Sequence, residues 1–186
     1  MKAFAAAALA AGLLVVPACG AESASTPSAP AVEQAFNPTD LAWIELMIPM
    51  DGQLLRVLKM VDTRAADPAV RKLAAQLSAG HQVELAELVK LRTRAGAPIT
   101  NMHEGHDMPG MMTEPEIVTF GRTRGAAFDR LLEKNLREHL EQSIVVARSI
   151  RTAGHEPAVK ALAASIEASR AAQLKLLRAV SFQRSA

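Results

Sequence analysis

The sequence predicts an all-α protein, a four-helix bundle built from a duplicated helical hairpin. Aromatic residues make up only 3% of the 186-residue chain, with no Tyr and one Trp, so the core has to be aliphatic. Apolar residues recur at helical spacing along four long segments. Residues 67–75 and 156–164 share the pattern acidic-Pro-Ala-Val-basic-x-Leu-Ala-Ala, 89 positions apart, which indicates an internal repeat.

The first 18 residues have the features of an export signal. Lys2 supplies a positive charge, an apolar stretch follows, and small residues precede the single cysteine, Cys19. Residues 16–19 resemble the bacterial lipobox, which predicts a lipoprotein signal peptide over 1–18 and lipidation of Cys19. An ordinary signal peptide with an incidental cysteine is the alternative. Residues 19–35 are expected to be a flexible tether, with the protein at the outer face of the plasma membrane, or in the periplasm or cell wall.

The remaining residues, 36–182, suit one helical domain. Removing Lys2 with the signal peptide leaves 20 of the 21 Lys and Arg against 19 Asp and Glu. This balance, without a basic stripe, argues against nucleic-acid binding. The sequence contains neither a convergent nucleophile nor paired carboxylates, and the Glu and Glu-x-x-His pattern of di-iron bundles is not met. We therefore expect no enzymatic activity.

The first hairpin is expected over residues 37–95. Asn37-Pro38 is an N-cap followed by proline in the first helical turn, and Asp67-Pro68 repeats this start for the second helix. Pro49 falls inside the first helix and should kink it. The apolar face of the first helix consists of Leu41, Ile44, Ile48, Leu55 and Leu58. That of the second consists of Val70, Leu73, Leu77, Leu85, Leu88 and Leu91.

The second hairpin is expected over residues 125–180, after a crossover of residues 96–124. Thr113–Glu116 is a capping box that opens a short helix within this crossover. The third long helix spans Gly125–Ala153, and the fourth begins at Glu156-Pro157. Neither hairpin can bury its apolar face alone, so the two should pack together as a four-helix bundle.

A loop in the crossover, residues 102–112, holds four of the chain's eight Met and two of its five His. The potential ligands of this Met/His loop are Met102, His103, His106, Met108, Met111 and Met112. Thioethers and imidazoles suit copper(I) before zinc or a harder cation. We therefore predict that the loop binds a copper ion. The alternative is a solvated linker whose methionines pack onto neighbouring helices.

The repeat also places polar residues together inside the bundle. The offset maps Met50 onto His139, and antiparallel pairing within each hairpin puts residue 81 level with residue 50 and residue 170 level with residue 139. Asp51, His81, His139 and Arg170 therefore fall at core positions in one layer. Polar side chains there must satisfy one another or hold an ion. Two interpretations stay open, an ionic cluster with Asp51 facing Arg170 and a ligand site.

Four features together resemble a known family. They are Met47–Pro49, the loop end Gly110–Thr113, Phe128–Leu131 and the paired acidic-Pro helix starts. They resemble the domain-of-unknown-function 305 family over about residues 36–180. The resemblance implies an exported bacterial protein with a ferritin-like four-helix bundle, in a family with some members linked to copper binding and copper tolerance.

The same resemblance implies a metal site within the bundle. The family has a His-His pair on the first helix and another on the third, where this chain has Met50-Asp51 and His139-Leu140. Met50 and His139 are therefore the bundle candidates for metal binding. Because three of the four histidines are replaced, the main prediction for a metal site moves to the Met/His loop.

The sequence thus predicts an exported, lipid-anchored metal-binding protein that serves copper binding or homeostasis through the Met/His loop. The alternative is a non-metal structural or interaction module whose ancestral metal site has decayed. The expected partners are a metal ion and, through the lipid anchor, the membrane. Nucleic acid is not expected as a partner, and the state as monomer or homo-oligomer is left open.

Overall fold

The computed structural model describes residues 35–180, and these residues form an all-α fold without strands. The helices are α1 (Pro38–Leu58), α2 (Val61–Arg64), α3 (Pro68–Arg94), α4 (Glu114–Arg122), α5 (Gly125–Ala153) and α6 (Pro157–Ala179). The predicted signal peptide, Cys19 and the tether up to residue 34 lie outside the described residues. None of the described helices has the length and hydropathy that a membrane span requires.

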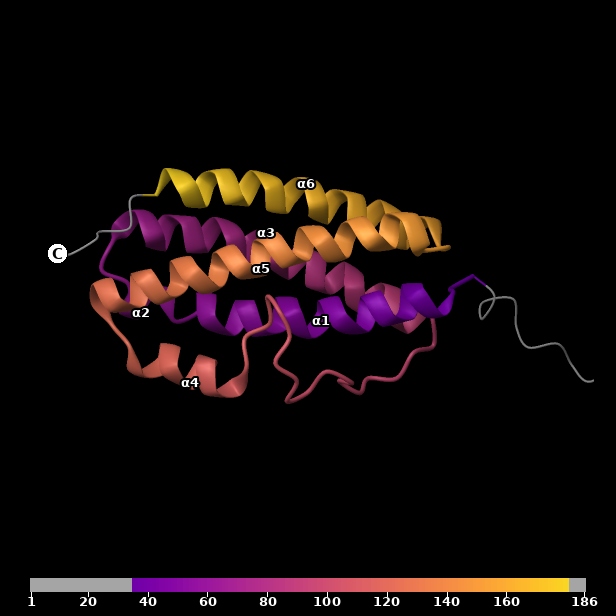
Figure 1. Cartoon of the computed structure of the whole chain (residues 1–186), viewed down its shortest axis with the longest axis horizontal. Coiled ribbons are helices and arrows are strands. Elements are labelled where there is room, and N and C mark those ends of the chain that lie inside the picture. Colours follow the sequence, from indigo (N-terminus) through magenta and orange to yellow (C-terminus); the bar gives the residue numbers. More distant parts are fainter. Residues whose placement is uncertain (1–34, 181–186) are drawn as a thin grey trace, which may run out of the picture.

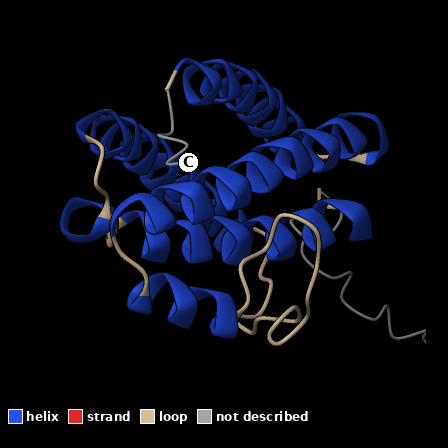
Figure 2. Ribbon diagram, turned by 60° about the vertical axis from the view of Figure 1, so that its left-hand side comes forward, coloured by secondary structure: helices blue, strands red, loops and turns tan. Residues whose placement is uncertain are grey.

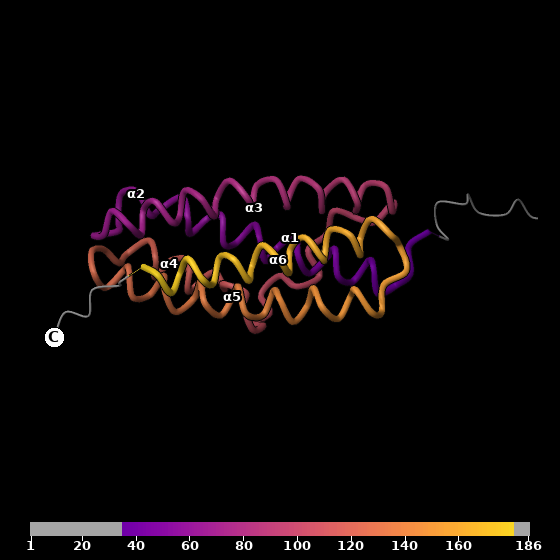
Figure 3. The backbone as a smooth tube through the Cα atoms, turned by 90° about the horizontal axis from the view of Figure 1, so that it is seen from above, coloured from indigo at the N-terminus to yellow at the C-terminus, as the bar shows by residue number. Residues whose placement is uncertain are grey.

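The four long helices, α1, α3, α5 and α6, run along the long dimension of the molecule and form the bundle (Figure 1). Packing is closest between α1 and α3 and between α5 and α6, so the two sequence repeats are the two hairpins. From above, α3 and α5 follow opposite edges, with α1 and α6 between them (Figure 3). Helix α4 and the crossover loop lie together on one side of the bundle (Figure 2). The predicted four-helix bundle is confirmed.

Local capping chemistry explains where the helices begin. The side chain of Asn37 accepts from the Asp40 N–H at 2.8 Å, and Asp40 accepts from the Asn37 N–H at 3.0 Å, which is a capping box. Thr113 and Glu116 form the predicted capping box at the start of α4. Helix α1 continues through Pro49 as one helix.

Two aspartates join the hairpins, each binding the turn of the other hairpin. Asp40 on α1 accepts from two backbone N–H groups in the α5–α6 turn, at 3.0 and 3.1 Å. Asp129 on α5, 89 positions later, accepts from two backbone N–H groups just before α3, at 3.1 and 3.2 Å. The internal repeat therefore extends from the sequence to the packing of the hairpins.

The buried apolar residues of the described chain form two clusters, one toward each end of the bundle. One contains Trp43, Ile44, Met47, Leu88, Ile150 and Ile166. The other contains Leu54, Leu77, Phe128, Leu136 and Leu174. Along α1, α3 and α6 the change from one cluster to the other takes place at a buried polar residue, namely Asp51, His81 and Arg170. The boundary between the clusters is therefore polar.

Candidate metal centre

A layer of polar side chains lies at this boundary. The polar layer consists of Asp51 on α1, His81 and Glu84 on α3, His139 on α5 and Arg170 on α6. Every member is at most 9% exposed, and three of them, Asp51, His81 and Arg170, are fully buried. Ionisable groups occupy such positions when they are paired or bind a ligand.

Asp51 is the centre of the polar layer. Its Oδ1 accepts a hydrogen bond from Arg170 Nη2 at 3.0 Å and lies 2.9 Å from His81 Nδ1 and 3.9 Å from His139 Nε2. Arg170 Nη2 forms a second ion pair, with Glu84 at 2.6 Å. The structure brings together the four residues that the repeat places in one layer. Glu84 was not singled out from the sequence, although its place one helical turn after His81 puts both on one face of α3.

The end of the Met/His loop orients His139. The Nδ1 atom of this residue lies 3.0 Å from the carbonyl oxygen of Gly110. Because a carbonyl oxygen can only accept, Nδ1 carries the proton and Nε2 presents a bare lone pair. This Nε2 is buried and has no hydrogen-bond partner among the described residues. A ring whose second nitrogen donates to a carbonyl is the arrangement typical of metal-binding histidines.

A carboxylate orients His81 in the same way. His81 Nδ1 and Arg170 Nη2 converge on Asp51 Oδ1, and the two nitrogens lie 3.2 Å apart. In the tautomer that carries its proton on Nδ1, His81 donates to the Asp51 carboxylate and its buried Nε2 is bare. One potential ligand atom from each of Asp51, His81 and His139 lies within 4.8 Å of the other two. Three donors from three helices therefore face a common space.

Burial keeps both imidazoles neutral. Desolvation is the largest cause that lowers the pKa of His81 to about 3, and the charge of Arg170 acts in the same direction. Desolvation also lowers the pKa of His139 to about 3, with smaller contributions from His81 and Arg170. Burial raises the pKa of Asp51 against the opposing effect of Arg170. Neutral imidazole is the form that binds a metal, so both rings are in the binding form at neutral pH.

Buried polar atoms without partners are concentrated in this layer. Within residues 35–180, the buried side-chain atoms without a hydrogen bond are Asp51 Oδ2, His81 Nε2, His139 Nε2, Arg170 Nε and Nη1, Gln173 Oε1 and Trp43 Nε1, together with Glu84 Oε2, which is nevertheless ion-paired with Arg170 Nη2. All except the Trp43 atom belong to the polar layer or to Gln173, one turn after Arg170. Unpaired buried polar atoms are costly, and an ion would satisfy the carboxylate and imidazole atoms. The residues of the polar layer therefore fit a bound metal.

Two methionines of the Met/His loop belong to the core. Met111 is 6% exposed and Met112 is 1% exposed, and each lies in a different hydrophobic cluster. Gly110, just before them, has a φ of +78° and supplies the carbonyl that His139 contacts. Met50, the other bundle candidate, is also buried among apolar side chains. The loop end thus packs directly over the polar layer.

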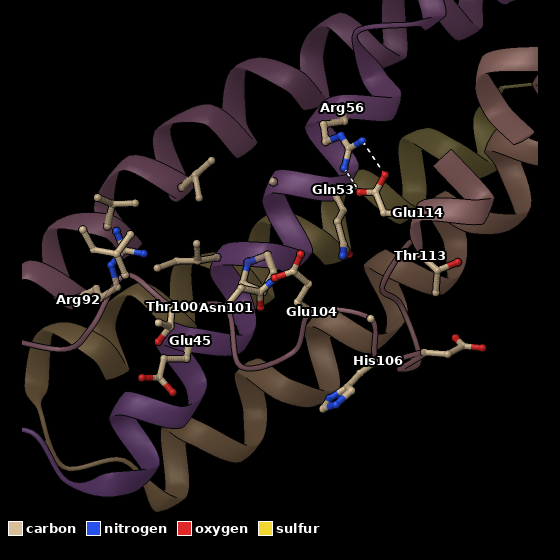
Figure 4. A pocket seen from close by; sticks show the side chains of 18 of the residues that line it. Glu45, Gln53, Arg56, Arg92, Thr100, Asn101, Glu104, His106, Thr113 and Glu114 are labelled. Carbon is tan, nitrogen blue, oxygen red and sulfur yellow. Dashed lines mark hydrogen bonds and ion pairs between the residues drawn. The ribbon is translucent and has the colours of Figure 1, made fainter. Parts of the chain in front are cut away.

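The other predicted loop ligands lie nearer to solvent. Met102 is 64% exposed, Met108 packs partly against a hydrophobic cluster, and the ring centroids of His103 and His106 are 6.3 Å apart. His106 and Glu104 line a cleft of about 940 Å³ between α1, α3 and the loop (Figure 4). The polar layer does not line this cleft. The exposed loop ligands and the buried layer are therefore two separate places.

Comparisons with known proteins agree with this fold. A family model described as "Domain of unknown function (DUF305)" matches residues 40–181. A DUF305 fragment from Deinococcus radiodurans has a similar structure, with a TM-score of 0.68 and 16% identity, over 77% of this chain and 95% of that chain. A DUF305 protein from Streptomyces coelicolor gives 0.64 and 20%, over 75% and 89% of the two chains.

A third solved structure is CopM in its Cu(II)-bound form. Its TM-score is 0.63 and its identity 22%, over 75% of this chain and 93% of CopM. At these identities the solved structures show a shared fold. No curated protein sequence gives a significant match to the chain.

Proposed function

The chain belongs to the DUF305 family, and on that premise we propose that it is an exported metal-binding protein whose metal is copper. The observation that carries this proposal is the cluster of Asp51, His81 and His139, in which one potential ligand atom of each residue lies within 4.8 Å of the others in a buried layer. Two imidazoles and a carboxylate suit copper, zinc or iron among the transition metals. That CopM, a protein of the same fold, has been solved with Cu(II) bound supports the choice of metal.

The Met/His loop has a role in this proposal as the place of first capture. Met102, His103 and His106 are accessible, and soft thioethers and imidazoles suit copper(I). The loop end is in contact with the polar layer through the hydrogen bond between His139 and the Gly110 carbonyl. The loop that would capture copper first is therefore in direct contact with one of the buried candidate ligands, His139.

Export and lipid anchoring complete the proposal. Support for export comes from the signal-like residues 1–18 and from the Streptomyces coelicolor relative, which is described as secreted. Support for the anchor comes from the lipobox-like position of Cys19. A lipid anchor would hold the copper site at the outer face of the membrane.

A structural module is the second candidate function. The observation in its favour is that Arg170 pairs with both carboxylates of the polar layer, Asp51 and Glu84, so the layer is partly neutralised without a metal. Ordered water on the remaining atoms would then satisfy them. This candidate predicts that the layer contributes to stability and that its histidines have no effect on metal binding.

The experiment is competition for copper(I) against a chromogenic chelator. A loop variant carries Met102→Leu, His103→Ala, His106→Ala and Met108→Leu, which leaves the two core methionines in place. A layer variant carries His81→Leu and His139→Leu, and the matched control is His155→Ala, an exposed histidine in the α5–α6 turn. We expect the layer variant to lose tight binding, the loop variant to take up copper more slowly, and the control to match the wild type. Equal competition by all four proteins would refute the proposal.

A further inference from the structure

Positive charge is concentrated at one end of the bundle. This basic end consists of residues 59–72, 122–131 and 175–180, and it contains nine Lys and Arg against three Asp. The other described residues contain ten Lys and Arg against fourteen Asp and Glu. We infer that the basic end binds a membrane surface that carries anionic lipid headgroups, a role separate from the proposed copper function.

Three segments that are far apart in the sequence form the basic end. They contain α2 and the start of α3, the end of α4 and the start of α5, and the end of α6. These parts lie together at the end of the molecule opposite the start of α1 (Figure 1 and Figure 3). Arg64 Nη1 donates to the Thr123 carbonyl at 3.3 Å, and Arg124 Nη1 donates to the Thr63 carbonyl at 3.2 Å. The fold therefore creates a concentration of charge that the balanced net charge of the sequence does not reveal.

Carboxylates do not neutralise the cations of the basic end within the described residues. None of its nine Lys and Arg forms an ion pair there, whereas eight of the ten other described Lys and Arg do. The hydrogen bonds of Arg64 and Arg124 go to carbonyl oxygens, which carry no net charge. A guanidinium has five N–H donors, so donors remain on both side chains for an anion.

Two of the three aspartates of the basic end are engaged by backbone groups. Asp129 is 4% exposed and accepts from the N–H groups of Ala66 and Asp67. Asp67 is the N-cap of α3 and accepts from the Ala69 N–H at 2.7 Å. Asp62 is the remaining acidic residue, and it is exposed. The surface of this end is therefore more positive than the residue counts alone indicate.

An extended anionic surface fits this arrangement better than a small anion does. Seven of the nine cations are exposed, and they belong to the ends of several helices instead of converging on one point. None of them lines the cleft of about 940 Å³ beside the Met/His loop. A membrane with anionic lipids presents many negative charges in one plane. Each Lys or Arg that reaches such a surface strengthens binding by about fivefold.

The length of chain before the bundle is sufficient for this contact. Residues 20–34 follow the predicted anchor Cys19 and would span up to about 50 Å if fully extended. Helix α5, with 29 residues, is about 44 Å long. A protein anchored at Cys19 can therefore turn its basic end toward the same membrane, although α1 starts at the opposite end of the bundle. The anchor would raise the effective concentration of the basic end at that surface.

The test measures binding to vesicles of phosphatidylcholine with and without phosphatidylglycerol. The protein is the mature chain with Cys19→Ser, so that no lipid anchors it. A basic-end variant neutralises four exposed cations, namely Lys59→Gln, Lys72→Gln, Arg122→Gln and Arg130→Gln. The matched control makes the same change in net charge outside the basic end, with Lys90→Gln, Lys160→Gln, Arg148→Gln and Arg151→Gln. Circular dichroism checks the helicity of each protein.

The wild type should bind the phosphatidylglycerol vesicles at least about tenfold more tightly than pure phosphatidylcholine, and added salt should weaken this binding. This comparison uses only the wild type, so it does not depend on how the variants fold. The basic-end variant should lose at least about tenfold in affinity for the anionic vesicles and the control less than about threefold.

Three results would overturn the inference. They are equal affinity of the wild type for the two kinds of vesicle, an equal loss of affinity in the two variants, and binding to duplex DNA without binding to the anionic vesicles. None of these results bears on the copper proposal, because no substituted residue belongs to the polar layer or to the Met/His loop.

Discussion

The ion pair between Asp51 and Arg170 should be strongly coupled, and a double-mutant cycle measures this. Both side chains are fully buried, and Arg170 Nη2 lies 3.0 Å from Asp51 Oδ1. In Arg170→Leu, the carboxylates of Asp51 and Glu84 lose their cation together, so we expect a loss of about 3–5 kcal/mol in the free energy of unfolding. In Asp51→Leu, Glu84 still pairs with Arg170, so the loss should be near the lower end of that range.

The double variant, Asp51→Leu with Arg170→Leu, should be milder than the sum of the two single variants. Removing both groups leaves no unpaired charge at that pair and fills the space with apolar atoms, so we expect a coupling energy of about 2–3 kcal/mol. The assay is urea unfolding of the metal-free protein at pH 7.5, followed by far-UV circular dichroism. If the slope of the unfolding free energy against urea concentration (the m value) is the same in all variants, the substitutions change stability and not the unfolding mechanism.

The matched control is an exposed ion pair on α3. Glu87 and Lys90 are 2.6 Å apart, with side chains 47% and 70% exposed. Their cycle should give a coupling of about 0.5 kcal/mol or less, because water screens both charges. If the Asp51 and Arg170 substitutions prove additive to within about 0.5 kcal/mol, the two charges do not depend on each other and the ionic description of the polar layer is refuted.

Three further predictions concern pH, the loop end and the lipid anchor. In the unfolded chain the histidines become protonated near pH 6.5, whereas burial keeps His81 and His139 neutral in the folded protein down to a pKa of about 3. The free energy of unfolding should therefore decrease by about 2 kcal/mol for each of these histidines when the pH is lowered from 7.5 to 5. Equal urea midpoints at the two pH values would count against this. Gly110→Ala should lower the free energy of unfolding by about 1–2 kcal/mol, because the φ of Gly110 is +78° and an added Cβ would lie 2.7 Å from a side-chain carbon of α5. The urea midpoint measures this loss, and an unchanged midpoint would show that the loop end is not held in this position. Cys19→Ser should move the protein from the membrane fraction to the soluble fraction, and unchanged partition would refute the anchor.

Much of the fold could be predicted because its signals are local or strictly periodic. Asn37-Pro38 and Thr113–Glu116 specify helix starts through hydrogen bonds within a few residues, and both capping boxes are present in the structure. The polar layer could be located as well, because straight antiparallel helices of equal rise keep residues level over many turns. Asp40 and Asp129 are also 89 positions apart, but only the structure shows that each binds the turn of the opposite hairpin.

Only the tertiary structure decided the chemistry inside that layer. Which imidazole nitrogen is bare depends on the Gly110 carbonyl near His139 and on the Asp51 carboxylate near His81, contacts between residues 29 and 30 positions apart. The sequence by itself determined that four helices meet at polar positions and that a loop rich in Met and His crosses between hairpins. It could not divide that loop into buried and exposed methionines, because burial depends on how the crossover packs against the bundle and not on residue type.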